Sequence, residues 1–229
     1  LTKAYKIDEI ITRHLEIMNK YDPAHRVDLI VDEWGTWFDV EEGTNPGFLY
    51  QQNSMRDAMV AGLTLNIFNK HSDRIRMANI AQTVNVLQAV ILTDGEDMVL
   101  TPTYHVFKMY KDHQKNTLLG SFITSEKIEC DGLKMPELIE SASMDDNGVI
   151  YSTIVNVAID EAKEIKCQIA DSEVKSVKAE IITGEMHAHN TFENKDVVTP
   201  AEFTDFTVTA DGFIATVPPC SVVKFIVER

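Results

Sequence analysis

The sequence is poor in the features that most directly identify a protein class. Its three cysteines, at positions 130, 167 and 220, are odd in number and far apart. We therefore expect neither a disulfide framework nor a CxxC-type zinc site, and we interpret all three as buried, unreactive thiols. No apolar run reaches the ~18 residues that a bilayer-spanning helix needs. The sequence predicts no membrane partner.

Positive charge is also scarce. The chain has 21 Lys and Arg against 36 Asp and Glu, which gives a formal net charge of −15. Binding to a phosphate backbone needs clustered cations, so we expect no nucleic-acid partner and favour a soluble protein. His187 and His189 lie two apart, but no third ligand with suitable spacing lies nearby. We therefore predict no metal site and no cofactor.

What the chain does contain is a large apolar fraction, 44% of its residues, arranged in two different patterns. Up to about residue 116, helical and strand patterns alternate, which is typical of α/β units with a parallel sheet. Helices are expected over residues 7–18, 55–70 and 82–92 and from residue 102, and strands over residues 27–31 and 75–81. Ser54 and Asp57 form a capping box, and Thr101 caps a helix that starts with Pro102.

Two parallel strands cannot form a stable sheet alone, because their edges and faces stay open. The first half therefore looks like the end of a larger unit. From Thr117 onward, short runs rich in Val, Ile, Thr and Phe are separated by turns such as "DDNG" (145–148). This pattern predicts an antiparallel β-sandwich, with a final hairpin turning at Pro218 and Pro219. We place the domains at residues 1–116 and 117–229.

The stretch "VDLIVDEWGTWF" (27–38) ends a β-rich run in two carboxylates and an aromatic cluster. The carboxyl end of a parallel strand faces the loops where α/β enzymes build their sites. Alternation places Asp32 and Glu33 on opposite sides, so they cannot act as a catalytic pair with each other. Trp34 and Trp37 offer flat apolar surfaces that suit sugar rings. A structural loop carboxylate at Glu33 is the alternative interpretation.

The wider sequence resembles the C-terminal portion of glycoside hydrolase family 51 α-L-arabinofuranosidases. The resemblance rests on "VDEWGTWF", on "RDAMVAGLTLNIFNKHSDRIRMANIAQTVNVLQAVILT", on "LTPTYHVFKMY", and on "HAHNTFENKDVV" and "VPPCSVVKF" in the second half. It covers almost the whole chain. The resemblance implies the end of a (β/α)₈ barrel, with residues 27–32 as strand seven and residues 75–81 as strand eight, followed by a jelly-roll-like β-sandwich.

The same resemblance implies retaining, exo-acting hydrolysis of terminal α-L-arabinofuranosyl groups from arabinan- or arabinoxylan-type saccharides. Glu33 falls on the family's nucleophile, and Gln82 falls on a glutamine that contacts the bound sugar. Trp34 is a further candidate for substrate contact. The family's acid/base glutamate follows an asparagine at the end of an earlier strand, and this chain has no such motif. We therefore expect a C-terminal fragment that is inactive alone, and a homo-oligomer when intact.

Two other functions remain open from the residues themselves. A retaining glycosidase with another sugar specificity would end a late barrel strand in the same kind of carboxylate. A non-catalytic carbohydrate-binding or assembly module would need a strip of exposed aromatic residues on one sheet. Polymer preference and cellular compartment are not encoded in any motif that we identify.

Overall fold

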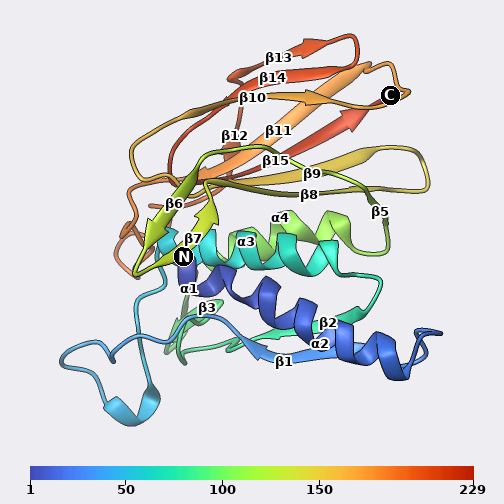
Figure 1. Cartoon of the computed structure of the whole chain (residues 1–229). Helices are drawn as coiled ribbons and strands as arrows, with labels where there is room; N and C mark the ends of the chain where they lie inside the picture. The colour runs from blue at the N-terminus through green and yellow to red at the C-terminus, as the bar shows by residue number, and fades with distance from the viewer.

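In the computed structural model, which describes all residues from Leu1 to Arg229, the first half places a short parallel sheet against a layer of helices (Figure 1). Its elements are α1 (Thr2–Tyr5), α2 (Ile7–Tyr21), β1 (Leu29–Trp34), η1 (Pro46–Phe48), α3 (Met55–Lys70), β2 (Ile75–Ile80), β3 (Ile91–Asp94), β4 (Asp97–Leu100), α4 (Pro102–Tyr110) and η2 (Lys111–His113). None of the helices is long and apolar enough to cross a lipid bilayer.

Three of the four expected helices form where their sequence signals lie. α3 starts with the capping box, in which the Ser54 and Asp57 side chains and backbone amides bond reciprocally. α4 begins with Pro102 directly after Thr101, and α2 ends at Tyr21, two residues before Pro23. These signals act within one or two turns of the chain, so they are readable without the tertiary structure.

The helix expected over residues 82–92 is wrong. This segment is an irregular loop that leads into β3, and Asn85 and Leu87 have positive φ angles of 57° and 54°. Two polar side chains stabilise the loop. Asn85 bonds the backbone of Thr93 in both directions, and Gln88 donates to the carbonyl of Ala81. Side chains that bond nearby backbone groups compete with helix formation. The β-branched residues of this segment further lower its helix propensity.

β1 and β2 form a parallel pair with one irregularity in each strand. Leu29, Val31 and Trp34 of β1 belong to the core beneath the helices or pack against it, although Trp34 lies an odd number of positions, three, after Val31. A register shift between these two residues accounts for the change of face. The register also shifts after Leu29, where Arg76 is the extra residue in β2. Such bulges reverse which side chains face the core.

The opposite face of this pair is uncovered. Ile30 and Met77 are register partners, and each is 48% exposed. In Figure 1, α3 and α4 lie between the β1–β2 pair and the sandwich, and beyond the pair only the light-blue loop that carries η1 extends, at the lower left of the view. A parallel sheet is normally covered on both faces, so an apolar residue pair on an open face is unusual.

The second half is a β-sandwich, as expected. A six-stranded sheet with the order β12-β11-β15-β9-β8-β5 faces a three-stranded sheet with the order β10-β14-β13, and β6 and β7 form a separate hairpin. The bounds are β5 (Thr117–Leu119), β6 (Lys127–Cys130), β7 (Leu133–Pro136), β8 (Leu138–Met144), β9 (Ile150–Asn156), β10 (Lys163–Gln168), β11 (Ser176–Thr183), β12 (Ala201–Glu202), β13 (Phe206–Thr209), β14 (Gly212–Val217) and β15 (Ser221–Glu228).

The expected final hairpin is wrong. β14 pairs with β10 and β13, whereas β15 pairs with β9 and β11, so the two strands lie in opposite sheets. Pro218 and Pro219 carry the chain from one sheet to the other. Two consecutive prolines cannot donate backbone hydrogen bonds, which ends one ladder before the next begins. The two prolines indicate a corner in the sequence. Only the strand pairing of β14 and β15 shows that this corner connects two sheets.

α3 connects the two halves. It is buried along most of its length and packs against β8, β9 and β15 on one side and against α4 on another. Within this contact the fully buried Asn66 donates to the carbonyls of Ile139 and Thr153, and its Oδ1 accepts from Ser141 and Thr153. A buried amide with all its bonds made fixes how the helix sits on the sheet.

At the amino end of the parallel pair, Arg74 is 1% exposed and stabilises the entry to both strands. Its guanidinium donates to Asn19 Oδ1, to the carboxylate and carbonyl of Asp22, and to the carbonyl of Val27. Bonds from the Val27 amide and from Arg74 lower the pKa of Asp22 to about 2. This cluster lies at the end of the strands opposite Glu33, so it serves stability.

The three cysteines are free, but only one fits the expected environment. Cys220 is buried, Cys167 is partly exposed and Cys130 is exposed. Cys130 ends β6 of a two-stranded hairpin, and such a hairpin has no second sheet to cover it.

Candidate functional site

Glu33 lies at the carboxyl end of β1, directly before the core residue Trp34. Because side chains alternate along a strand, the inward position of Trp34 places Glu33 on the uncovered face, together with Ile30. Glu33 is exposed, and its carboxylate makes no hydrogen bond or ion pair within the chain. The β-bulge thus separates a tryptophan that belongs to the core from a carboxylate that is exposed.

Gln82 follows the adjacent strand end. Trp34 pairs with Ile80, and the amide of Ala81 donates to the carbonyl of Trp34 at 3.0 Å, so the two strand ends lie side by side. The side chain of Gln82 is exposed and has no hydrogen-bond partner in the chain. Asn79 is also exposed, on the same face of β2 as Met77. The edge therefore presents two neutral amides beside the exposed carboxylates of Asp32 and Glu33.

The two tryptophans have different environments. Trp34 is 8% exposed and packs edge-on against Phe68, with ring centroids 5.4 Å apart, and in a stack with Phe107 at 5.9 Å. This placement gives Trp34 a packing role and no free surface for a sugar. Trp37, four residues after Glu33, is 69% exposed. It is the aromatic surface available at this edge.

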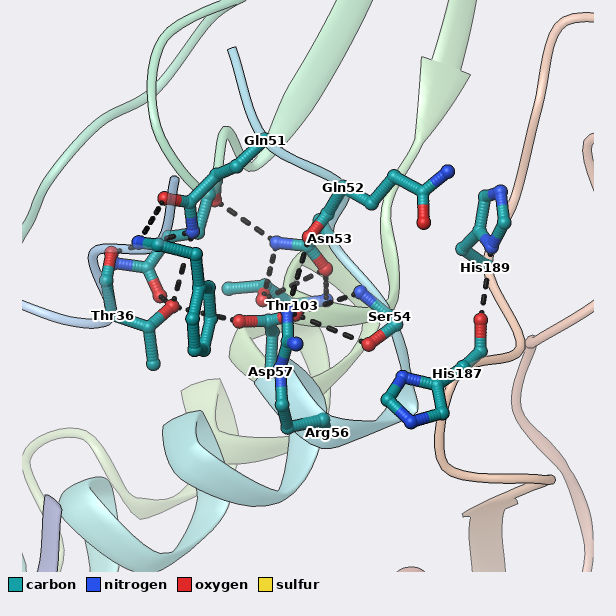
Figure 2. A network of polar contacts seen from close by, with 12 residues as sticks. Thr36, Gln51, Gln52, Asn53, Ser54, Arg56, Asp57, Thr103, His187 and His189 are labelled. Atoms are coloured by element: carbon teal, nitrogen blue, oxygen red, sulfur yellow. Dashed lines mark hydrogen bonds and ion pairs between the residues drawn. The ribbon is translucent and has the colours of Figure 1, made fainter. Parts of the chain in front are cut away.

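The loop after β1 is held by a buried polar network, which Figure 2 shows from close by. Thr36 Oγ1 donates to Asp57 Oδ1 at 2.7 Å, and the amide of Phe38 donates to Gln51 Oε1 at 2.9 Å. Asp57 is fully buried, and its second oxygen accepts from the Ser54 amide and from Arg56. The loop that follows Glu33 is thereby attached to the first turn of α3.

A second part of the network reaches α4 and the loop after β2. Asn53 donates to Thr103 Oγ1 at 2.7 Å and to the carbonyl of Gln88 at 3.0 Å. Figure 2 shows Gln51 and Asn53 projecting from the segment before α3 into this cluster. Gln51, Asn53 and Gln88 are not among the site residues expected from the sequence. For Gln51 and Asn53 the only local signal is the polar run "QQN" directly before the helix cap Ser54, since their partners lie far away in sequence.

Three carboxylates in the sandwich, those of Glu126, Glu137 and Glu161, lie within 4.8 Å of one another. The ammonium group of Lys163 stands among them, at 2.7 Å from Glu137 and from Glu161. These bonds, first to Glu137 and then to Glu161, raise the pKa of Lys163. The cluster is therefore a salt-bridge network centred on Lys163.

His187 and His189 do not form a metal-binding pair on a strand. They lie in the connection between β11 and β12, where His189 Nδ1 is 2.9 Å from the carbonyl oxygen of His187 (Figure 2). His189 also forms an isolated bridge with Ser54, next to the capping box of α3. The pair therefore connects the sandwich to the segment that holds the Glu33 loop.

Comparison with known proteins identifies relatives of the whole chain. The family described as "Alpha-L-arabinofuranosidase C-terminal domain" matches residues 32–221. The chain is 44% identical to the intracellular exo-alpha-L-arabinofuranosidase of Bacteroides ovatus, over 96% of this chain and 43% of that protein. The chain therefore spans less than half the length of that relative.

Solved structures give the same result. The family 51 arabinofuranosidase of Xanthomonas axonopodis pv. citri superimposes with a TM-score of 0.96 and 41% identity, over 100% of this chain and 46% of that one. The alpha-L-arabinofuranosidase of Thermotoga maritima, solved with arabinose, shares the fold with a TM-score of 0.86 at 24% identity, over 100% of this chain and 49% of that one. The chain belongs to the family 51 α-L-arabinofuranosidases and represents their C-terminal portion.

Proposed function

We propose that these residues form the C-terminal part of a retaining, exo-acting α-L-arabinofuranosidase, with Glu33 as its nucleophile. The observation that carries this proposal is the position of Glu33. It projects, exposed and without a partner, from the carboxyl end of a parallel strand on the uncovered face of the sheet. Active sites of barrel enzymes lie at that end of the strands.

The uncovered face supports a barrel that further polypeptide completes. β1 and β2 would be its strands seven and eight, and residues 1–116 its C-terminal portion, followed by the jelly-roll-like sandwich of residues 117–229. Ile30 and Met77 would then face the side chains of other strands in the barrel interior, which is filled in such folds. The relatives, which are about twice as long as this chain, leave room for these strands.

In the proposed mechanism the Glu33 carboxylate attacks the anomeric carbon of a terminal α-L-arabinofuranosyl group and forms a glycosyl ester. A second carboxyl group, which this chain does not supply, donates a proton to the leaving oxygen. It then accepts a proton from the water that hydrolyses the ester. Two such carboxyl groups stand about 5–5.5 Å apart in retaining enzymes. The substrate class follows from the names of the relatives.

The neighbours of Glu33 suit a sugar substrate. Gln82 offers both a donor and acceptors to sugar hydroxyls, and as a neutral amide it leaves the charge of Glu33 unchanged. Trp37 presents an exposed ring that can cover an apolar sugar face. Trp34 has no contact with substrate in this proposal, because its ring is enclosed by Phe68 and Phe107.

The sandwich does not favour the carbohydrate-binding alternative. Phe203, Phe213 and Phe225 are at most 6% exposed, and in its core Phe225 stacks on Phe213 and meets Phe203 edge-on. The most exposed aromatic residue of this half, Phe122, stands alone at 89% exposure. A binding module would place several such rings along one sheet face. We assign the sandwich a supporting role, which extends to subunit contacts in a homo-oligomer.

The test uses an aryl α-L-arabinofuranoside and two proteins, the chain of 229 residues and the full-length protein that contains it. We expect turnover only by the full-length protein, since loss of general acid–base catalysis alone costs about 10²–10⁴-fold. Glu33→Ala should abolish that turnover, and azide should restore part of it by forming a glycosyl azide. Turnover by the short chain, or an active Glu33→Ala enzyme, contradicts the proposal. Aryl xylosides and glucosides test the alternative of another sugar specificity.

A further inference from the structure

Gln88 has an environment that packing alone does not explain. It lies in the loop between β2 and β3, its side chain is polar, and only 2% of its surface is exposed. Its Nε2 donates to the carbonyl of Ala81 at 3.0 Å, and its Oε1 accepts from Thr36 Oγ1 at 3.0 Å. Ala81 directly precedes Gln82, and Thr36 lies three residues after Glu33. One amide therefore contacts both segments of the proposed site.

This amide stands where the ladder between β1 and β2 ends. The last backbone bond runs from the Ala81 amide to the Trp34 carbonyl. In a regular parallel ladder the next bond would run from the Thr36 amide to the Ala81 carbonyl. Here the side chain of Gln88 supplies the donor to Ala81 and bonds the Thr36 hydroxyl instead. The strand ends separate at this point, and Gln88 spans the space between them.

Gly35 provides the space for this arrangement. Its φ is +136°, and a Cβ at this position would overlap the amide of Gln88. The Ala81 carbonyl only accepts hydrogen bonds, which fixes the orientation of the amide with Nε2 toward it. Thr36 Oγ1 lies 3.0 Å from Gln88 Oε1 and 2.7 Å from Asp57 Oδ1, so this hydroxyl links Gln88 to α3. The amide is thus held at both ends.

We propose that Gln88 is a positioning residue that sets the separation of Glu33 from Gln82. The inference rests on the proposed function of these two residues. A nucleophile must meet the anomeric carbon of a sugar that the neighbouring strand end holds, and a displacement of about 1 Å can cost 10²-fold in rate. Gln88 touches no substrate itself. It acts by replacing the missing rung between the two strand ends.

The experiment compares kcat and KM of Gln88→Leu and wild type in the full-length protein, with an aryl α-L-arabinofuranoside. Leucine keeps much of the volume and removes both hydrogen bonds. We expect kcat to fall about 10²-fold, with KM changed far less, because the lost geometry matters most in the transition state. Gln51→Leu is the matched control. Gln51 is also buried and also bonds Thr36, but its side chain makes no hydrogen bond to the Ala81–Gln82 segment, so the kcat of this variant should fall much less.

Gln88→Glu gives a second readout that a packing role does not predict. A protonated carboxyl has the shape of the amide and can donate to Ala81, whereas the carboxylate cannot. Burial raises the pKa of such a group. The activity of Gln88→Glu relative to wild type should therefore rise as the pH falls. This nearly isosteric variant also provides the test if Gln88→Leu does not fold.

The outcomes separate the two proposals. If Glu33→Ala abolishes activity but folded Gln88→Leu keeps kcat within about threefold of wild type, the positioning role is wrong and the nucleophile assignment stands. An equal loss in Gln51→Leu, or a pH-independent ratio for Gln88→Glu, also overturns the positioning role. If Glu33→Ala remains active, the proposed function itself fails, and with it the basis of this inference.

Discussion

The two halves of the molecule cover their sheets differently. In the sandwich, the two sheets enclose a core that includes Phe213, Phe225 and Val227, each at most 1% exposed. In the first half, one face of the β1–β2 pair lies against the helices and the other leaves Ile30 and Met77 half exposed. The sandwich therefore buries its own apolar faces. The parallel pair presents a face that is suited to contact with further polypeptide.

The proposed site lies on the half whose sheet has an uncovered face. Exposed side chains lie at the open strand ends, at Glu33, Gln82 and Trp37. The polar side chains in the core of the sandwich, in contrast, are buried. The comparison indicates that the sandwich and α3 provide a rigid base. The site surface remains to be closed by the rest of the proposed barrel. Four predictions follow this contrast from the largest expected effect to the smallest.

Phe225→Ala should weaken the sandwich most. Its ring is fully buried and packs on Phe203, Phe206 and Phe213, with centroid distances of 4.3–6.1 Å. Loss of such a ring costs about 3–5 kcal/mol. Urea unfolding of the 229-residue chain measures this loss. Phe122→Ala, at a position that is 89% exposed, is the control and should change stability by less than about 0.5 kcal/mol. Equal effects would refute the described core.

Met77→Ala should have different effects in the short and the full-length protein. In the 229-residue chain the side chain is 48% exposed, so its loss should cost less than about 1 kcal/mol. If the barrel is completed over this face, the same change creates a cavity and costs about 2–5 kcal/mol. Met59→Ala, at a fully buried position of α3, should be costly in both proteins. If Met77→Ala lowers the stability of the 229-residue chain and of the full-length protein by the same small amount, the proposed barrel is contradicted.

His113 should make the contact between the halves sensitive to acid. Burial, followed by the charge of Lys224, lowers its pKa to about 4, although Asp112 opposes this. The ring nitrogens lie 2.8 Å from Ser143 Oγ and 3.1 Å from Thr153 Oγ1.

Between the ordinary histidine pKa of about 6.5 and the folded-state pKa of about 4, the unfolded chain binds a proton at this histidine while the folded chain does not. Stability is therefore lost as the pH falls from 6.5 toward 4, by up to about 3 kcal/mol. Urea midpoints at pH 7 and pH 5 measure the effect. His113→Gln keeps an amide for both hydroxyl partners and should reduce the difference. An unchanged difference would show that other groups cause it.

Trp37→Ala should have the smallest effect. In the full-length protein we expect KM for an aryl arabinofuranoside to rise about tenfold or less, because an aromatic contact contributes about 0.5–1.5 kcal/mol. Folding should be unaffected at a position that is 69% exposed. Phe122→Ala serves as the matched exposed aromatic of the sandwich and should leave KM unchanged. If both variants alter KM equally, Trp37 has no specific place at the site.

Local signals explain what could be predicted from the sequence. The capping box of Ser54 and Asp57 and the Thr101–Pro102 start act within one turn, and the helices that follow them are as expected. The loop after Ala81 was missed because the bonds that stabilise it, from Asn85 to Thr93 and from Gln88 to Ala81, compete with a helix that its apolar spacing also permits. Periodicity alone does not reveal which set of bonds is stronger.

The sequence proposes site residues only where they belong to a family motif. Glu33 and Gln82 follow from "DEW" and "NIAQTVNVLQ", and both occupy adjacent strand ends. Trp34 is expected from the sequence to contact substrate, but its side chain lies in the core. The β-bulge that turns it inward leaves no sign in the sequence pattern. Gln88, although within the second motif, has no visible role until Ala81 and Thr36 are placed on either side of it.

The sequence by itself determined the class of elements in each half, the caps that begin two helices, and the acidic strand end that carries Glu33. Tertiary structure decided which way the side chains of that strand end point, and that Pro218 and Pro219 join two sheets. The physical reason is that helix caps and β-propensity act between neighbouring residues. Strand register, bulges and buried polar bonds depend on partners that are distant in the chain.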